Sequence, residues 1–319
     1  MSLWLTVTIF ILSSVALVKA GTWLVRTLTR IARFLKWREF TVAFILMAFA
    51  TSVPELFVGI TSALQMQTEL SFGDIIGSNI INLTLVVAVT VFLAGGLKLK
   101  QALTQETSVY TMALAFLPVL LLLDGAISRM DGLVLFLGLA FYLSQLKEEE
   151  ARFTREITDE LEKGWEGLKS FLKDVGLFVG STIIILIAAD GIVWSATSLV
   201  SFSPLSIASI GTLIVALGTG LPELVFGLRA VSLDQKEMIM GGIMGSVVSN
   251  STLVLGTAVL IHPLQVLNYQ PYLVGIAFTV LTIIAFTFFS RTDHEINQGE
   301  ALGLLVVYIL FVAIQLFLG

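Results

Sequence analysis

The sequence predicts an all-α integral membrane protein with ten transmembrane helices, arranged as two inverted five-helix repeats. Three observations predict this fold. The 319 residues are 56% hydrophobic and 13% charged, a composition typical of chains that cross a membrane many times. Ten apolar segments have about the length that a bilayer requires, and one pair of motifs occurs in both halves of the chain. The basic residues concentrate in every second connection between the segments, which indicates the direction in which each half crosses the membrane.

The ten apolar segments fall into two groups of five around a charged connection. A helix needs roughly 20 residues to cross a bilayer. The predicted spans are 3–24, 40–64, 70–96, 107–124, 131–146, 175–200, 205–231, 238–262, 269–289 and 300–318. The first of them lacks the basic start and the small-residue cleavage site of a signal peptide, so we expect it to be a membrane helix.

The basic residues predict the orientation. Sixteen of the 18 Lys and Arg lie in the odd-numbered connections or at their edges, and basic residues concentrate on the cytoplasmic side. We therefore expect a cell-membrane protein with both termini extracellular. Because five spans is an odd number, the second half enters from the opposite side. The predicted parts are a first repeat, 1–146, a cytoplasmic linker, 147–174, and a second repeat, 175–319.

The linker combines dense charge with apolar residues broadly on one helical face. This pattern predicts a helix at the membrane surface, with no room for a further cytoplasmic domain. The apolar positions are Phe153, Ile157, Leu161, Leu168 and Leu172.

The recurring motif places a glutamate directly after a proline inside an apolar segment. Its copies run from Ala48 to Glu55 and from Ala216 to Glu223, and each is followed by a cluster of Gly, Ser and Asn. The whole motif regions, 48–82 and 216–250, are 168 residues apart. Such a constant offset indicates an internal duplication, and inverted repeats with interrupted helices are typical of secondary transporters.

The two glutamates are the strongest candidates for a functional site. A carboxylate at membrane depth costs roughly 2.5 to 3.5 kcal/mol and is read as functional by default. Pro54 and Pro222 should open the preceding helical turn, and a bound cation would satisfy the freed carbonyl groups. No Lys or Arg is predicted at the depth of Glu55 and Glu223, so we do not expect them to form salt bridges.

Further oxygen ligands occur at helical spacing. Ser78 and Asn82 are four residues apart, as are Ser246 and Asn250, so each pair shares a helix face. Oxygen ligands suit hard cations such as Ca²⁺, Na⁺ or Mg²⁺. The charge of two carboxylates is balanced by one Ca²⁺, two Na⁺ or two protons. Ion exchange requires this equality of charge between the ions that are exchanged. For Asp74 and Asp190 the sequence allows two interpretations, a position near the outer surface or at a helix end, or a role in an access path to the site.

Several other classes of protein are disfavoured. The chain has no Cys and only two His, His262 and His294, which do not form a hydrolase motif. It also lacks a phosphate-binding loop, so we expect no enzyme and no cofactor. No sequence feature indicates a nucleic-acid ligand or an obligatory protein partner. A passive channel would share the polar midplane but would not need inverted halves.

These motifs resemble the α-repeats of the Na⁺/Ca²⁺ exchanger family, within the cation/Ca²⁺ antiporter superfamily. The resemblance implies antiport of Ca²⁺ against Na⁺, with the first and sixth helices sliding over the others. It implies that Glu55 and Glu223 bind Ca²⁺ with the backbone carbonyls of Thr51 and Thr219. The Na⁺ ligands that it implies are Ser52, Ser78, Ser246 and the carbonyls of Ala48 and Ala216, while Asn82 and Asn250 take the remaining polar positions.

The sequence departs from the family pattern at two of these positions. Many prokaryotic members have Ser where this chain has Gly220, and many have Asp where it has Asn250. Both departures bear on Na⁺ binding and leave the Ca²⁺ ligands in place. Exchange of Ca²⁺ against H⁺, or transport of another divalent cation, is therefore the alternative.

Overall fold

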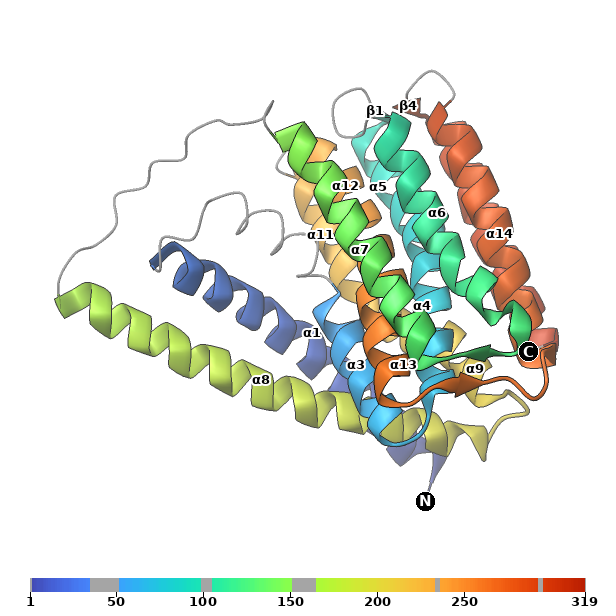
Figure 1. Cartoon of the computed structure of the whole chain (residues 1–319), viewed down its shortest axis with the longest axis horizontal. Coiled ribbons are helices and arrows are strands. Elements are labelled where there is room, and N and C mark those ends of the chain that lie inside the picture. The colour runs from blue at the N-terminus through green and yellow to red at the C-terminus, as the bar shows by residue number, and fades with distance from the viewer. Residues whose placement is uncertain are drawn as a thin grey trace.

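The fold is all-α. The computed structural model describes residues 2–34, 52–98, 105–150, 165–232, 236–291 and 295–318. Nearly all of them lie in helices, which form one bundle from which two long helices project (Figure 1). Four strands of two residues each lie at the ends of the bundle.

The first repeat begins with a long helix and continues with shorter ones. Its elements are α1 (Leu3–Phe34), α3 (Val53–Leu64), α4 (Thr68–Ile81), the π-helix η1 (Asn82–Val86), α5 (Val87–Ala94), β1 (Leu97–Lys98), α6 (Gln105–Leu121), the 3₁₀ turn η2 (Leu122–Asp124), β2 (Ala126–Ile127) and α7 (Arg129–Glu150).

The second repeat follows the same plan. Its elements are α8 (Trp165–Val200), α9 (Ile207–Ile210), the π-helix η3 (Gly211–Val215), α10 (Ala216–Thr219), α11 (Leu221–Ser232), α12 (Lys236–Ser249), the π-helix η4 (Asn250–Val254), α13 (Leu255–Ile261), β3 (Leu264–Gln265), α14 (Gln270–Arg291), β4 (Glu295–Ile296) and α15 (Gln298–Leu318).

The duplication is visible in the helix boundaries. Helices α3 and α11 have 12 residues each, α4 and α12 have 14 each, and η1 and η4 have five each. Helices α11 and α12 and the π-helix η4 each start 168 residues after their counterparts, which is the offset of the sequence motifs. The duplicated motifs therefore fold into the same succession of elements.

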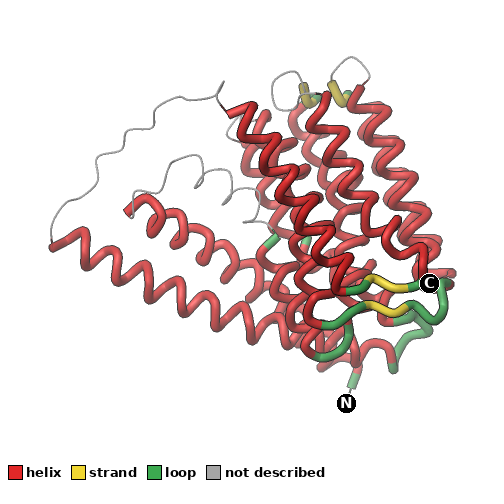
Figure 2. Tube along the Cα trace, in the orientation of Figure 1, coloured by secondary structure: helices red, strands yellow, loops and turns green. Residues whose placement is uncertain are grey.

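The strand pairs show that the repeats are inverted. Strand β1 pairs with β4, and β2 pairs with β3, both antiparallel. Because β1 corresponds to β3 and β2 to β4, the two pairs are counterparts of each other. They lie at opposite ends of the bundle (Figure 2), as two copies facing in opposite directions require.

The predicted ten-helix fold is confirmed, and residues 40–51 of the predicted second span lie outside the described residues. Seven described helices are long and apolar enough to cross a membrane, and two shorter apolar ones lie at Val53–Leu64 and Val109–Asp124. Helix α7 completes the set of ten segments. Helix α8 already begins at Trp165, so part of the predicted linker forms its first turns. Residues 151–164 of the linker, with the apolar positions Phe153, Ile157 and Leu161, lie outside the described residues.

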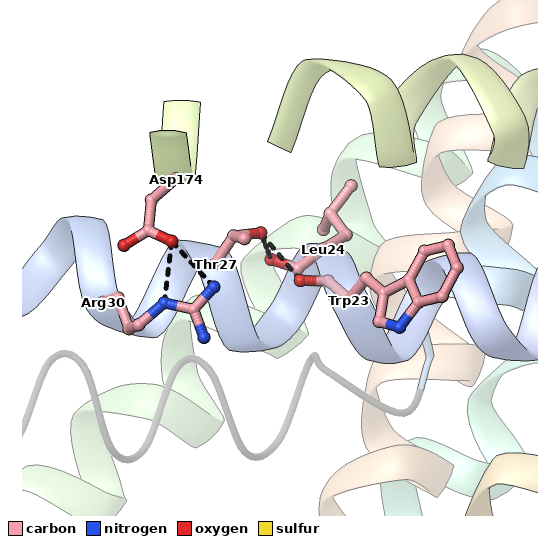
Figure 3. Close-up of polar contacts among 5 residues, drawn as sticks. All are labelled: Trp23, Leu24, Thr27, Arg30 and Asp174. Atoms are coloured by element: carbon pink, nitrogen blue, oxygen red, sulfur yellow. Dashed lines mark hydrogen bonds and ion pairs between the residues drawn. The ribbon is translucent and has the colours of Figure 1, made fainter. Parts of the chain in front are cut away.

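Helices α1 and α8 are counterparts that pack against each other and project from the bundle (Figure 1). They run antiparallel, because Arg30 near the end of α1 meets Asp174 near the start of α8. Arg30 Nη2 lies 2.7 Å from Asp174 Oδ1, and Arg30 Nε donates to the same oxygen at 2.8 Å (Figure 3). Thr27 on the same side of α1 donates to the carbonyl oxygens of Trp23 and Leu24. The ion pair thus joins the two projecting helices to each other.

Helix α4 lies in the centre and nearly all its residues are buried. It packs backbone to backbone against α9 and η3. A Cβ atom added at Gly73 would lie 2.2 Å from the Ala208 carbonyl oxygen, and one at Gly77 would lie 2.1 Å from that of Thr212. Only glycine permits this approach. At the equivalent position of the second repeat, by contrast, a Cβ at Gly241 would meet no described atom within 4 Å.

Candidate cation-binding site

The two glutamates lie in the first turns of α3 and α11 and are buried in the bundle. Glu55 is 0% exposed and Glu223 is 2% exposed. A carboxylate near a helix N-terminus is stabilised by the free backbone N–H groups and the helix dipole. Helix α10 ends at Thr219, three residues before Pro222, and α11 begins at Leu221. The helix of the second repeat is therefore interrupted at Gly220, just before the proline that was expected to open it. The equivalent turn of the first repeat lies outside the described residues.

Glu223 accepts a hydrogen bond from a serine hydroxyl that also contacts groups of the first repeat. Ser246 Oγ on α12 donates to Glu223 Oε1 at 2.7 Å. Ser52 Oγ, just before α3, lies 3.3 Å from Ser246 Oγ, and Asn82 Nδ2 at the start of η1 donates to the same oxygen at 3.2 Å. The two copies of the motif therefore meet at one cluster of polar groups.

Several acceptor oxygens in this cluster receive no hydrogen bond from the described residues. They are both carboxylate oxygens of Glu55, Glu223 Oε2, Asp74 Oδ2, Asn82 Oδ1 and Asn250 Oδ1. An unpaired buried carboxylate is strongly unfavourable, and each such group in a folded protein calls for an explanation. A cation bound among these oxygens would supply the missing partner.

The structure places Asp74, which the sequence left open between a surface position and an access path, next to Ser78 and Thr219 of this cluster. Asp74 is 1% exposed on α4. Its Oδ1 atom accepts hydrogen bonds from Thr219 Oγ1 at 2.8 Å and from Ser78 Oγ at 3.4 Å. Glu55 and Glu223 lie within electrostatic range of it. The one available signal was its spacing of four residues from Ser78, which places both on one face of α4.

The structure places the other predicted site residues as follows. Thr219 Oγ1 lies 3.4 Å from Ser78 Oγ and 3.2 Å from the Val215 carbonyl oxygen. Ala216 is buried at the start of α10, and its carbonyl oxygen accepts the Gly220 N–H. Asn250 begins η4 and is 0% exposed. Ala48 and Thr51 lie outside the described residues.

The carboxylates do not form a compact cluster. Among the described residues, no three His, Cys, Asp or Glu side chains are placed to hold one metal ion. A cation between Glu55 and Glu223 would therefore depend on hydroxyl, amide and carbonyl oxygens for the remaining ligands. Such a mixed oxygen set suits Ca²⁺ and Na⁺.

The remaining polar candidates lie away from the site. Asp190 accepts a hydrogen bond from Gln65 Nε2 at 2.7 Å in an exposed position. His262 caps the C-terminal end of α13, and its Nδ1 atom lies 2.9 Å from Thr68 Oγ1. Asp131 accepts from the backbone N–H of Ser128 before α7. These groups stabilise helix ends and connections.

The fold and the site together define a membrane transporter built from inverted repeats, with a buried polar centre between them. The family model for the "Sodium/calcium exchanger protein" matches residues 5–146 and 173–317. The chain belongs to this sodium/calcium exchanger family of membrane exchangers.

Individual relatives agree with the family. The chain is 26% identical over 351 residues to the sodium/calcium exchanger MaX1 of Methanosarcina acetivorans, covering 97% of this chain and 98% of MaX1. A structure of the sodium-calcium exchanger NCX_Mj has 25% identity and a TM-score of 0.65, with 98% and 99% of the chains covered. The H⁺/Ca²⁺ exchanger CAX has the same fold, with a TM-score of 0.75, 20% identity, and coverage of 98% and 86%.

Proposed function

We propose that this protein is an antiporter that exchanges Ca²⁺ for Na⁺ across a cell membrane by alternating access. The observation that carries the proposal is the buried pair Glu55 and Glu223, contributed by oppositely directed repeats, with carboxylate oxygens that lack hydrogen-bond donors among the described residues. A site formed by both repeats can open to one side and then to the other as the repeats move relative to each other.

The charge of the pair explains exchange. Two carboxylates balance one Ca²⁺ or two monovalent cations. An empty, doubly charged site would be strongly unfavourable in the interior of the bundle. The carrier therefore changes its orientation only when loaded, and uptake of one ion is coupled to release of the other.

The ligands would come from both motifs. Glu55, Glu223 and the carbonyls of Thr51 and Thr219 would bind Ca²⁺. Na⁺ would bind through hydroxyl groups and carbonyl oxygens close to the same carboxylates, and Asn82 and Asn250 would line the centre. The Na⁺ ligands are Ser52, Ser78, Ser246, Ala48 and Ala216. The names of MaX1 and NCX_Mj support Na⁺ as the coupling ion.

Exchange of Ca²⁺ against H⁺ is the second candidate, because Gly220 offers no hydroxyl where its counterpart Ser52 has one.

The test uses purified protein in sealed vesicles with Na⁺, K⁺ and pH gradients imposed separately. We expect ⁴⁵Ca²⁺ uptake to follow an outward Na⁺ gradient. Uptake that ignores Na⁺ and follows the pH gradient would establish the second candidate. Flux that is unaffected by every counter-ion gradient would indicate a channel.

A further inference from the structure

The two halves of the site differ in their polar groups. We call Ser52, Glu223 and Ser246 the Glu223 half, and their counterparts Gly220, Glu55 and Ser78 the Glu55 half. The substitution of Ser by Gly220 removes one hydroxyl group from the Glu55 half. Asp74 adds a carboxylate to this half, and its counterpart in the other half is Gly242, which has no side chain.

The hydrogen bonds of the two halves differ in the same way. In the Glu223 half, Ser246 Oγ donates to the glutamate at 2.7 Å. In the Glu55 half, Ser78 Oγ donates instead to Asp74 Oδ1, at 3.4 Å. Thr219 Oγ1 donates to that oxygen as well. Glu55 consequently receives no hydrogen bond from a described residue.

Packing explains why only one half has the extra carboxylate. A Cβ atom at Gly242 would lie 2.6 Å from Phe226 Cε1. The counterpart of Phe226 is the smaller Val58. The aromatic ring of the second repeat thus occupies the space that an acidic side chain would need, whereas the first repeat leaves room for Asp74.

Asp74 has the features of a cation ligand. It is 1% exposed, and its Oδ2 atom has no partner among the described residues. Among the described residues, the ion pair is formed by Arg30 and Asp174, and Asp74 takes no part in it. A buried carboxylate with a free oxygen and no basic partner needs a cation. Ser78 and Thr219 turn their hydroxyl hydrogens toward Oδ1 and keep oxygen lone pairs for the same ion.

We infer that Asp74, with the hydroxyl groups of Ser78 and Thr219, forms a monovalent-cation subsite in the Glu55 half, in which its carboxylate replaces the hydroxyl group that Gly220 lacks. This inference rests on the proposed exchange function. Asp74 therefore determines Na⁺ affinity, while Glu55 and Glu223 determine Ca²⁺ binding.

The test compares the full chain with its Asp74→Asn variant in sealed vesicles. Two fluxes are measured: Ca²⁺/Ca²⁺ exchange without Na⁺, and Ca²⁺ uptake as a function of internal Na⁺. Asp124→Asn is the control, because Asp124 is an exposed carboxylate that binds a loop N–H far from the site. We expect Asp74→Asn to raise the Na⁺ concentration for half-maximal uptake by at least about tenfold. Ca²⁺/Ca²⁺ exchange should stay within about threefold, and the control should leave both fluxes unchanged.

The outcomes separate the inference from the proposed function. Wild-type Ca²⁺ exchange that does not depend on Na⁺ would overturn both. A Na⁺-dependent wild type with an unchanged Asp74→Asn variant would overturn the subsite alone, as would equal loss of both fluxes in folded variant protein. If Asp74→Asn does not fold, as judged by gel filtration, Asp74→Ser removes the same charge and is measured in its place.

Discussion

Glu55 and Glu223 occupy equivalent positions in the two repeats, but their surroundings differ. Glu223 accepts a hydrogen bond from Ser246, whereas Glu55 accepts none from the described residues. Both side chains are buried. Since a buried carboxylate is stable only with donors or a cation around it, Glu55 is the more dependent of the two on a bound ion.

The first prediction concerns these two carboxylates. Glu55→Gln and Glu223→Gln keep the size of the side chain and remove one charge each, so the site can no longer balance Ca²⁺. We expect ⁴⁵Ca²⁺ uptake into vesicles to fall to the background of protein-free vesicles in both variants. Gel filtration in detergent should give the wild-type profile, because the substitution also removes a buried charge. Transport retained by either variant would exclude that glutamate from the site.

The strongest candidate site residues that the sequence predicted have a counterpart in the other repeat. Glu55 and Glu223 stood out because each occurs at the same place in a duplicated motif. Asp74 did not, because its counterpart is Gly242. The hydrogen bond from Asn79 Nδ2 to Ser251 Oγ, 2.8 Å long, was equally hidden. A contact between residues that the other copy lacks leaves no repeated pattern, and only the folded chain brings its members together.

At the scale of elements, the helices of the site are interrupted by π-helical turns. The π-helices η1 and η4 begin at Asn82 and Asn250, the two asparagines of the motif. A π-turn inserts one residue into a helix and changes the direction of the following side chains, and it occurs frequently at functional sites. The sequence predicted a continuous span here, since the apolar pattern of a π-turn does not differ from that of an α-helix over five residues.

Glycine contacts provide the second prediction. Gly73→Ala would push a methyl group into the Ala208 carbonyl group, 2.2 Å away. Because a backbone carbonyl cannot move aside freely, we expect a loss of at least about 2 kcal/mol in the free energy of unfolding. The measurement is unfolding in detergent, followed by circular dichroism.

The matched control is Gly241→Ala at the equivalent position of the second repeat. A Cβ there would meet no described atom within 4 Å. Alanine has the higher helix propensity, so this variant should be as stable as the wild type or more stable by up to about 1 kcal/mol. Equal effects of the two substitutions would contradict the backbone contact of α4 with α9.

The ion pair between α1 and α8 provides the third prediction (Figure 3). The side chain of Asp174 is 10% exposed and that of Arg30 is 49% exposed. Arg30→Gln leaves a mostly buried carboxylate without its partner, at a cost of about 1–3 kcal/mol. Asp174→Asn leaves an arginine that still reaches water, so its effect should be within about 0.5 kcal/mol.

A double-mutant cycle distinguishes these contributions. The double variant should be more stable than Arg30→Gln alone, because the unpaired carboxylate is then absent. Thermal unfolding in detergent gives the four stabilities. If Asp174→Asn proved the more harmful single change, the buried carboxylate would not be the sensitive partner.

At the scale of the whole molecule, inversion is the property on which alternating access depends. The sequence predicted it from an odd number of spans in each half, and the two counterpart strand pairs at opposite ends of the bundle confirm it. Charge counting could predict this because a wrong number of spans would have scattered the basic residues over both sides. It could not predict how far α1 and α8 project from the bundle, since their packing depends on contacts 144 residues apart in the chain, such as Arg30 with Asp174.

The last prediction concerns the direction of the chain in the membrane. The sequence has no Cys, so a single introduced cysteine reports its side without background. Ser2 precedes α1 and Gln298 begins α15, and these residues lie in the extracellular and cytoplasmic regions that the basic residues predict. Ser2→Cys should react with a membrane-impermeant maleimide in intact cells, and Gln298→Cys should react only after the membrane is opened.

The two cysteines serve as controls for each other, because both variants must react fully in detergent and must retain Ca²⁺ uptake. The reverse labelling pattern would mean that the whole chain has the opposite orientation in the membrane, with the two repeats still inverted relative to each other. Labelling of both cysteines in intact cells would mean that an odd number of the segments from α1 to α14 fails to cross the membrane. That result would contradict the ten-span topology.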